Sequence, residues 1–191
     1  MERKQEELGI HILENARNEL YYHFPYLDGA FACISGKASD QTRTIGTDGE
    51  DFLFSPEYLL ELYVKKPEAV RRGYLHMLLH CLYLHIFREN QEDKRMWNLA
   101  CDIAVEQIIT REKLHSLKIP ENEVRRKVLQ RLGGQADSAE KICRKLKEEA
   151  FSFRLEEMEE AFHFDDHTLW DTCTGEKGKR TKEKWNKLLS Y

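Results

Sequence analysis

The sequence predicts a mainly helical α+β fold with a small antiparallel sheet and two buried helices at its centre. Apolar residues recur at helical spacing over most of the 191 residues, as in amphipathic helices. Short runs rich in β-branched and aromatic residues lie between residues 30 and 54 and are separated by turn residues, as in strands. Two segments, residues 73–87 and 97–109, consist mostly of apolar residues, which is typical of buried helices.

The N-terminal part of the chain predicts one helix and three short strands. The helix covers residues 3–23 and ends before Pro25, because the residue before a proline disfavours α geometry. Its apolar stripe consists of Leu8, Ile12, Leu13, Ala16 and Leu20. Asp48-Gly49 is a turn signal between the last two of three predicted strands, which cover residues 30–34, 42–46 and 52–54. We expect these strands to form an antiparallel meander packed against helices.

Three helices are expected next. Ser55 at the cap and Pro56 at the first helical position mark the start of a short helix over residues 56–65. The central helix is predicted over residues 67–88, and a second apolar helix over residues 95–111. Because these two helices are close in sequence, we expect them to pack together as a two-helix core.

The chain becomes more polar beyond Pro120. We therefore place one domain over residues 1–118 and a peripheral helical extension over residues 119–191. Residues 174–184 are rich in Lys, Thr and Gly and are expected to be flexible. The helices predicted in the extension cover residues 121–132, 138–149, 152–161 and 181–189.

The composition argues against several kinds of partner. A formal net charge of −4 gives no reason to expect nucleic acid or an anionic membrane. No apolar run approaches the length of a membrane span, and the first residues are polar, unlike a signal peptide. The five cysteines are odd in number and form no CxxC pair, so free thiols are expected. We expect a cytoplasmic protein that binds neither nucleic acid nor membrane.

Two histidines of the central helix are the strongest candidates for chemistry. His76 and His80 are four residues apart, so a helix places both imidazoles on one face. A buried imidazole needs a polar partner, and two on one face can bind one divalent metal ion together. Alternatively, both are core histidines bonded to a carbonyl or hydroxyl. His85 lies on the opposite face of a straight helix, and it reaches the same ion only if the helix unwinds near residue 84.

Two carboxylates of the second apolar helix complete the candidate site. Asp102 and Glu106 are also four residues apart and share one helix face. Two imidazoles and one carboxylate form a familiar zinc ligand set that leaves a fourth position for water. We expect His76, His80 and Asp102 as ligands, with Glu106 as an outer partner or substitute ligand. The alternative for the carboxylates is helix capping or an ion pair with an arginine such as Arg71.

The order and spacing of these motifs resemble a bacterial family described as putative metallopeptidases, whose members often carry a C-terminal von Willebrand factor A-like domain. The pattern of that family joins a TDG turn, an aromatic and proline helix start, HExxHxxxxH and WNxAxDxxxN. Over residues 5–110 this chain supplies Thr47-Asp48-Gly49, Phe54-Ser55-Pro56-Glu57, His76, His80, His85 and Trp97-Asn98-Leu99-Ala100-Cys101-Asp102. The resemblance implies a zincin-like domain that binds zinc, and it favours Asp102 over Glu106 as the ligand.

Two residues depart from that pattern. Met77 stands where the family has the glutamate that takes a proton from zinc-bound water, and Glu106 replaces an asparagine. Methionine cannot accept a proton, and loss of a general base costs about two to four orders of magnitude in rate. Glu106 is the candidate for a replacement base. The stretch His167-Thr168-Leu169-Trp170 resembles a weaker motif of the family and is expected to be a surface turn.

The sequence therefore predicts a metallopeptidase-like domain that binds zinc, hydrolyses peptides poorly and acts as a binding or assembly module. The resemblance implies a von Willebrand factor A-like domain and a MoxR-type AAA ATPase as partners, and we expect residues 119–191 to lead toward such a domain. Two alternatives stay open. One is an active zinc-dependent peptidase that uses another base, and the other is a metal-free protein-interaction domain whose histidines belong to the core.

Overall fold

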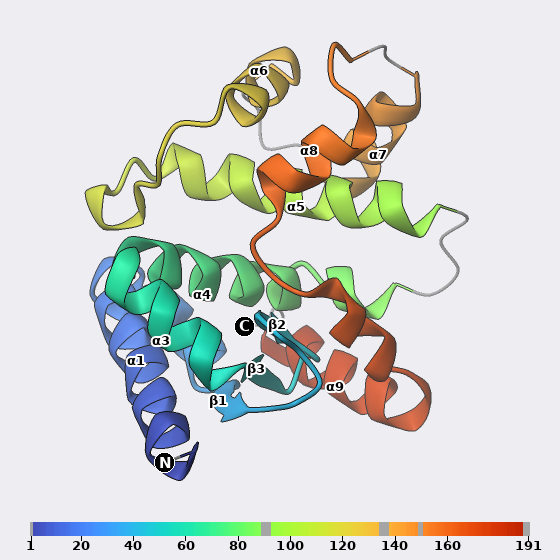
Figure 1. Ribbon diagram of the computed structural model, residues 1–191. Coiled ribbons are helices and arrows are strands. Elements are labelled where there is room, and N and C mark those ends of the chain that lie inside the picture. The colour runs from blue at the N-terminus through green and yellow to red at the C-terminus, as the bar shows by residue number, and fades with distance from the viewer. Residues whose placement is uncertain (1, 89–92, 134–137, 149–150, 189–191) are drawn as a thin grey trace. The chain divides into compact units, whose positions relative to one another are not determined.

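The computed structural model describes residues 2–88, 93–133, 138–148 and 151–188 (Figure 1). The chain divides into two compact units. The first unit comprises Met1–Arg88 together with Asp165–Tyr191, and the second comprises Glu89–Phe164. The C-terminal segment thus belongs with the N-terminal part of the chain. The domain boundary at residue 118, which rests on composition alone, stays a prediction.

The first unit begins with the amphipathic helix α1 (Glu2–His23), which a 3-10 turn, η1 (Pro25–Leu27), follows. The helix packs against the sheet and against two further helices, α3 (Pro56–Lys65) and α4 (Pro67–Leu82). The predicted stripe is buried except for Leu8, which is 50% exposed. Gly9 faces the core instead, where a Cβ would collide with the ring of Phe54.

Three short strands form a mixed sheet, so the predicted antiparallel meander is wrong. The strand order is β1-β3-β2, and β3 is antiparallel to β2 but parallel to β1. The strands are β1 (Ser35–Ala38), β2 (Ile45–Thr47) and β3 (Asp51–Phe54). The strand predicted over residues 30–34 is also wrong, because Asp28–Phe31 forms the short helix α2. Gly36 of β1 packs closely on Leu13 of α1, so helix packing rather than strand propensity positions β1.

The central helix is shorter than predicted. α3 and α4 are separated at Lys66, whose backbone is not helical (φ −151°, ψ 71°), because the residue before a proline disfavours α geometry. α4 ends at Leu82 instead of continuing to residue 88, because Leu84 adopts a left-handed conformation with φ 58°. A 3-10 helix, η2 (His85–Phe87), then turns the chain.

The C-terminal part of the first unit is helical, so the predicted flexibility of residues 174–184 is wrong. A 3-10 helix, η4 (His167–Thr172), leads into α9 (Gly175–Leu188). Thr181 and Trp185 of α9 are buried, and these anchors outweigh the polar composition of the helix. The sheet lies between α9 and the group formed by α1, α3 and α4 (Figure 1).

Helices are the regular secondary structure of the second unit in the part that the structure describes. Its helices are α5 (Lys94–Arg111), α6 (Glu123–Arg131), α7 (Ala139–Glu148) and α8 (Leu155–Phe162), with a 3-10 turn, η3 (His115–Leu117). α5 packs against α7 and α8, and α6 packs against α8. The helices predicted between residues 95 and 161 are therefore confirmed within a few residues. α4 and α5 belong to different units, and the two-helix core stays a prediction.

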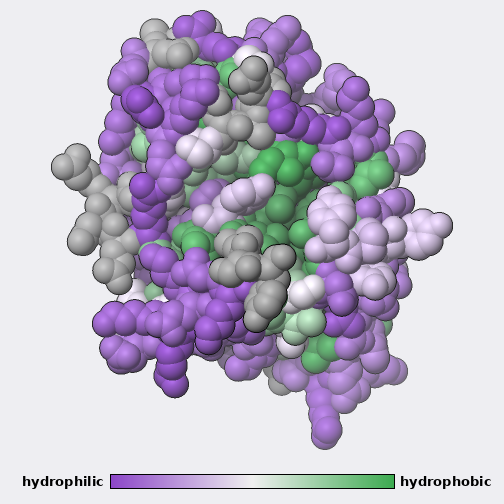
Figure 2. All heavy atoms as spheres, turned by 180° about the vertical axis from the view of Figure 1, so that it is seen from behind, coloured by the Kyte–Doolittle hydropathy of each residue, from purple (hydrophilic) through white to green (hydrophobic). Residues whose placement is uncertain are grey.

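These elements confirm the expected class, a mainly helical α+β protein with a small sheet. The face seen in Figure 2 is largely hydrophilic, in keeping with the 34% of charged residues in the sequence. Within the described ranges, every helix is too short or too polar to span a membrane.

Candidate metal centre

The central helix places two imidazoles side by side in the interior. His76 and His80 lie on adjacent turns of α4, and both are fully buried. Their Nε2 atoms are 2.9 Å apart and their ring centroids 4.6 Å apart, so the rings share one face as their spacing predicts. Two nitrogen lone pairs at this distance repel unless a proton or a cation lies between them.

A second element brings a carboxylate and a third imidazole to the same place. This element is the η4 segment, residues 165–172. Asp165 Oδ1 is 3.1 Å from Nε2 of His167 and 3.5 Å from Nε2 of His76. The Asp165 side chain is fully buried, and that of His167 is 10% exposed. The site therefore combines side chains from two elements that are far apart in the sequence.

The predicted surface turn over residues 167–170 is wrong. Leu169 and Trp170 are buried, and the Trp170 ring stacks on that of His167 with centroids 3.9 Å apart. The available signal was the pair of large apolar residues inside a polar stretch, since such residues usually pack inward. Asp165 and His167 could have been suspected from that burial, but no local periodicity links them to α4.

The η4 segment is docked on strand β2. The backbone N–H of Asp166 donates to the carbonyl of Ile45 at 2.7 Å, and the hydroxyl of Thr42 donates to Asp166 Oδ2 at 2.9 Å. Asp166 Oδ1 in turn caps η4 by accepting from the backbone N–H of Thr168 at 3.0 Å. A Cβ at Gly46 would lie 2.8 Å from the Asp166 carbonyl oxygen, so glycine permits this close approach.

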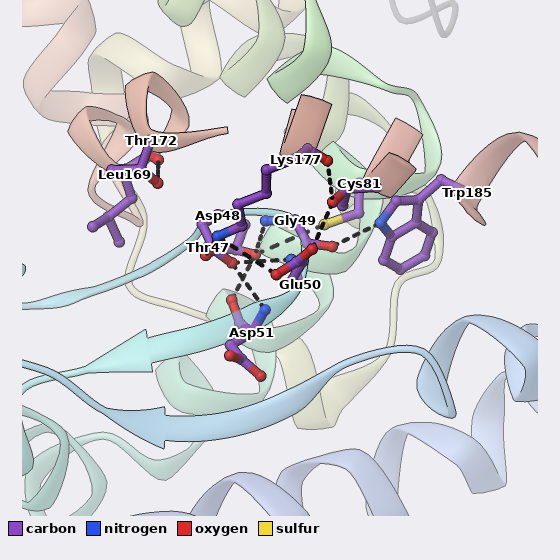
Figure 3. A network of polar contacts seen from close by, with 11 residues as sticks. Thr47, Asp48, Gly49, Glu50, Asp51, Cys81, Leu169, Thr172, Lys177 and Trp185 are labelled. Carbon is purple, nitrogen blue, oxygen red and sulfur yellow. Dashed lines mark hydrogen bonds and ion pairs between the residues drawn. The ribbon is translucent and has the colours of Figure 1, made fainter. Parts of the chain in front are cut away.

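The C-terminal end of the η4 segment is held indirectly. The helix α9, which follows the segment, is bonded to the turn between β2 and β3 (Figure 3). Asp48 Oδ1 accepts from the backbone N–H groups of Glu50 and Asp51 at 3.0 and 2.9 Å, and Asp48 Oδ2 accepts from Lys177 Nζ at 2.8 Å. Burial alone would raise the pKa of the Asp48 carboxyl, but Lys177 and these N–H groups hold the pKa below its ordinary value. The charged turn thereby fixes the start of α9.

Two further contacts join the same turn to α9. The backbone of Gly49 has φ 86°, a conformation that favours glycine, and its carbonyl accepts from Trp185 Nε1 at 2.8 Å. The hydroxyl of Thr181 donates to Glu50 Oε1 at 2.8 Å. The Thr47-Asp48-Gly49 motif thus has a structural role, because it anchors the helix that follows the η4 segment.

The four converging side chains are suited to a divalent metal ion. Ligand atoms of His76, His80, Asp165 and His167 all lie within 4.8 Å of one another. Tetrahedral ligands at zinc distances are about 3.3 Å apart, and the 2.9, 3.1 and 3.5 Å separations given above fall around that value. The buried Asp165 Oδ2 has no hydrogen-bond partner among the residues that the structure describes. An unsatisfied buried carboxylate oxygen is costly, and a cation would satisfy it.

The group contains one carboxylate, that of Asp165, beside three imidazoles. Burial alone would raise the pKa of the Asp165 carboxyl, but His167, His80 and His76 together hold the pKa below its ordinary value. The carboxylate therefore stays ionised beside nitrogen donors. Imidazole and carboxylate ligands suit zinc and other divalent transition metals.

His85 contacts His80 through Nδ1, the ring nitrogen of His80 that does not face His76. The left-handed backbone of Leu84 ends the regular helix, and the Nδ1 atoms of His85 and His80 are 3.0 Å apart. The helix therefore unwinds where the sequence indicated. The result is a contact between two imidazoles, and the four-residue group described above does not include His85.

Three further residues entered the sequence-based prediction. Met77, which follows His76, is fully buried in the core of the first unit. Asp102 and Glu106 are buried residues of α5 in the second unit. Their roles as ligand and base stay predictions.

Comparisons with known proteins identify a family. A family model described as "Putative metallopeptidase domain" matches residues 10–187. No curated protein and no solved structure matches the chain. The match confirms the resemblance found in the motifs, and it continues beyond residue 110 to include the η4 segment and most of α9.

Proposed function

The chain belongs to the family described as a putative metallopeptidase domain, and from this membership we propose that it binds one divalent metal ion, with zinc as the first candidate. The proposal rests on one observation above all, the buried group of His76, His80, Asp165 and His167. A bound zinc ion would act as a Lewis acid, and it would lower the pKa of a water molecule only if it keeps a coordination position beside its protein ligands. The sequence-based assignment of Asp102 as a further ligand is part of the proposal.

We propose that hydrolysis at this site is impaired. The position that carries the proton-accepting glutamate in the resembling family is Met77, and its thioether cannot accept a proton from water. Burial of Met77 in the apolar core supports a packing role for this residue. Glu106 is the only replacement base that the sequence suggests. The domain would then act through binding, and the resemblance suggests a von Willebrand factor A-like domain and an AAA ATPase as partners.

The first test is the metal content of the purified protein, measured by elemental analysis after incubation with zinc. We expect about one zinc per chain, and no zinc in a His76→Ala/His80→Ala double variant. The matched control is His11→Ala/His23→Ala, which removes two exposed histidines of α1 and should keep the metal. An unaltered protein without metal would support the metal-free interaction domain instead.

The second test concerns catalysis. Met77→Glu restores a carboxylate beside the first histidine, and peptide hydrolysis should rise by about two to four orders of magnitude if only the base is missing. Fluorogenic peptides with the zinc-loaded protein provide the measurement. Chelator-sensitive cleavage by the unaltered protein, lost in Glu106→Gln, would contradict impairment and favour the active peptidase.

A further inference from the structure

His80 contacts His85 through one ring nitrogen and His76 through the other. His80 Nε2 faces His76 at 2.9 Å, whereas His80 Nδ1 faces His85 Nδ1 at 3.0 Å. Both residues are buried: His80 is 0% exposed and His85 is 7% exposed. At these distances each pair of nitrogens must share a proton or a cation.

The backbone adopts an uncommon conformation to create this contact. Leu84 has φ 58° and ψ 26°, a left-handed conformation that costs conformational energy for residues other than glycine. A straight helix would have carried His85 to the face opposite His76. Strained residues persist where the surrounding structure requires them. Here the strain turns the His85 ring back toward His80.

We propose that His85 is a positioning residue for the metal ligand His80. This inference rests on the proposed metal site and specifies how one of its ligands is held. If Nε2 of His80 binds the ion, its proton is on Nδ1, and Nδ1–H donates to the lone pair of His85 Nδ1. His85 then carries its own proton on Nε2. The hydrogen bond fixes the tautomer and the orientation of the His80 ring.

The geometry separates this role from that of a ligand. The nitrogen that His85 presents is directed to Nδ1 of His80, while Nε2 of His80 faces Nε2 of His76, and His85 is not a member of the group. A single imidazole nitrogen cannot accept a hydrogen bond from His80 and bind the ion at the same time. His85 thus acts on the metal only through His80.

A matched pair of variants tests the proposal. His85→Phe keeps a ring of similar size but removes the acceptor, and the affinity for zinc should fall by about 10- to 100-fold. His85→Asn places an amide oxygen near the position of Nδ1, so its loss should stay under about tenfold. Zinc affinity is measured by competition with a chromophoric chelator, and circular dichroism verifies that each variant is folded. Equal affinities in the unaltered protein and His85→Phe would overturn the proposal.

Two further outcomes are decisive. Complete loss of zinc in both variants, as in His76→Ala/His80→Ala, would make His85 a ligand and overturn the positioning role. Long-range nitrogen NMR of the unaltered zinc-loaded protein should give the Nδ1–H tautomer for His80, and the Nε2–H tautomer would overturn the proposal without any variant. If the unaltered protein binds no zinc, the proposed function fails and this inference fails with it. Zinc binding together with a negative result for His85 overturns this inference alone.

Discussion

Helix α4 and the η4 segment bring side chains to the same place by different means. α4 sets the positions of His76 and His80 by backbone periodicity, which needs no particular neighbour. The η4 segment is a short 3-10 helix, and the positions of Asp165 and His167 depend on contacts with β2 and on the anchoring of α9. One half of the centre is therefore encoded locally, and the other half depends on tertiary contacts that single substitutions can weaken.

The sharpest test of this comparison removes the carboxylate of the η4 segment. Asp165→Asn keeps the shape of the side chain but replaces the charged ligand, so zinc affinity should fall by more than the roughly 10- to 100-fold typical of outer contacts. The control is Asp171→Asn, which changes an exposed carboxylate of the same segment. Competition with a chelator measures both. Equal affinity in Asp165→Asn and the unaltered protein would exclude the η4 segment from the centre.

A second test changes how closely the η4 segment packs on β2 and leaves every proposed metal ligand unaltered. In Gly46→Ala the new Cβ would lie 2.7 Å from Leu169 Cδ1 and 2.8 Å from the Asp166 carbonyl oxygen. Such overpacking costs about 1–3 kcal/mol, so the free energy of unfolding and the zinc affinity should both fall. Urea unfolding and metal competition provide the two measurements.

The control for that variant lies in the other half of the centre. Gly73→Ala adds the same methyl group to α4, where the nearest atom is the flexible end of Ile45 at 3.0 Å. Alanine also gains about 1 kcal/mol of helix propensity over glycine, so this change should be near neutral. Similar losses in Gly46→Ala and Gly73→Ala would contradict the difference between the two halves.

The same difference explains what could be predicted from the sequence. Helices with a clear apolar stripe, such as α1, α3 and α5, are found close to their predicted positions, because periodicity is a local signal. Strand β1, with the sequence SGKA, has little strand propensity, and its pairing depends on α1. No local pattern could have identified a parallel partner in β3, so the predicted meander failed.

The candidate site divides in the same way. The spacing of His76 and His80 is sufficient to place them together on a helix, whereas Asp165 and His167 join them through contacts distant in sequence. The left-handed conformation of Leu84 could not be predicted from the sequence either, because leucine rarely adopts a positive φ. Conversely, Thr47-Asp48-Gly49 was predicted correctly as a turn, but its role in anchoring α9 required the positions of Lys177 and Trp185.

The smallest expected effect concerns this anchoring turn and its dependence on pH. The folded-state pKa of Asp48 is lowered, so its ion pair stabilises the fold above the unfolded pKa, and the contribution is lost as the pH falls through the folded pKa. Asp48→Asn keeps the acceptor for the backbone N–H groups but loses the charge that faces Lys177. We expect a loss of about 1 kcal/mol at neutral pH and a weaker decline in stability between neutral pH and pH 3.

Asp51 of the same turn is the matched control, because its pKa is shifted in the opposite direction from that of Asp48. Burial, followed by the charge of Asp48, raises the pKa of Asp51, so its ionised form opposes folding as the pH rises. Asp51→Asn should therefore leave stability at neutral pH unchanged or slightly higher. Urea unfolding across this pH range compares the two variants. If Asp48→Asn and Asp51→Asn shift stability in the same direction, the turn does not anchor α9 through charge, and the η4 segment must be held by its contacts with β2 alone.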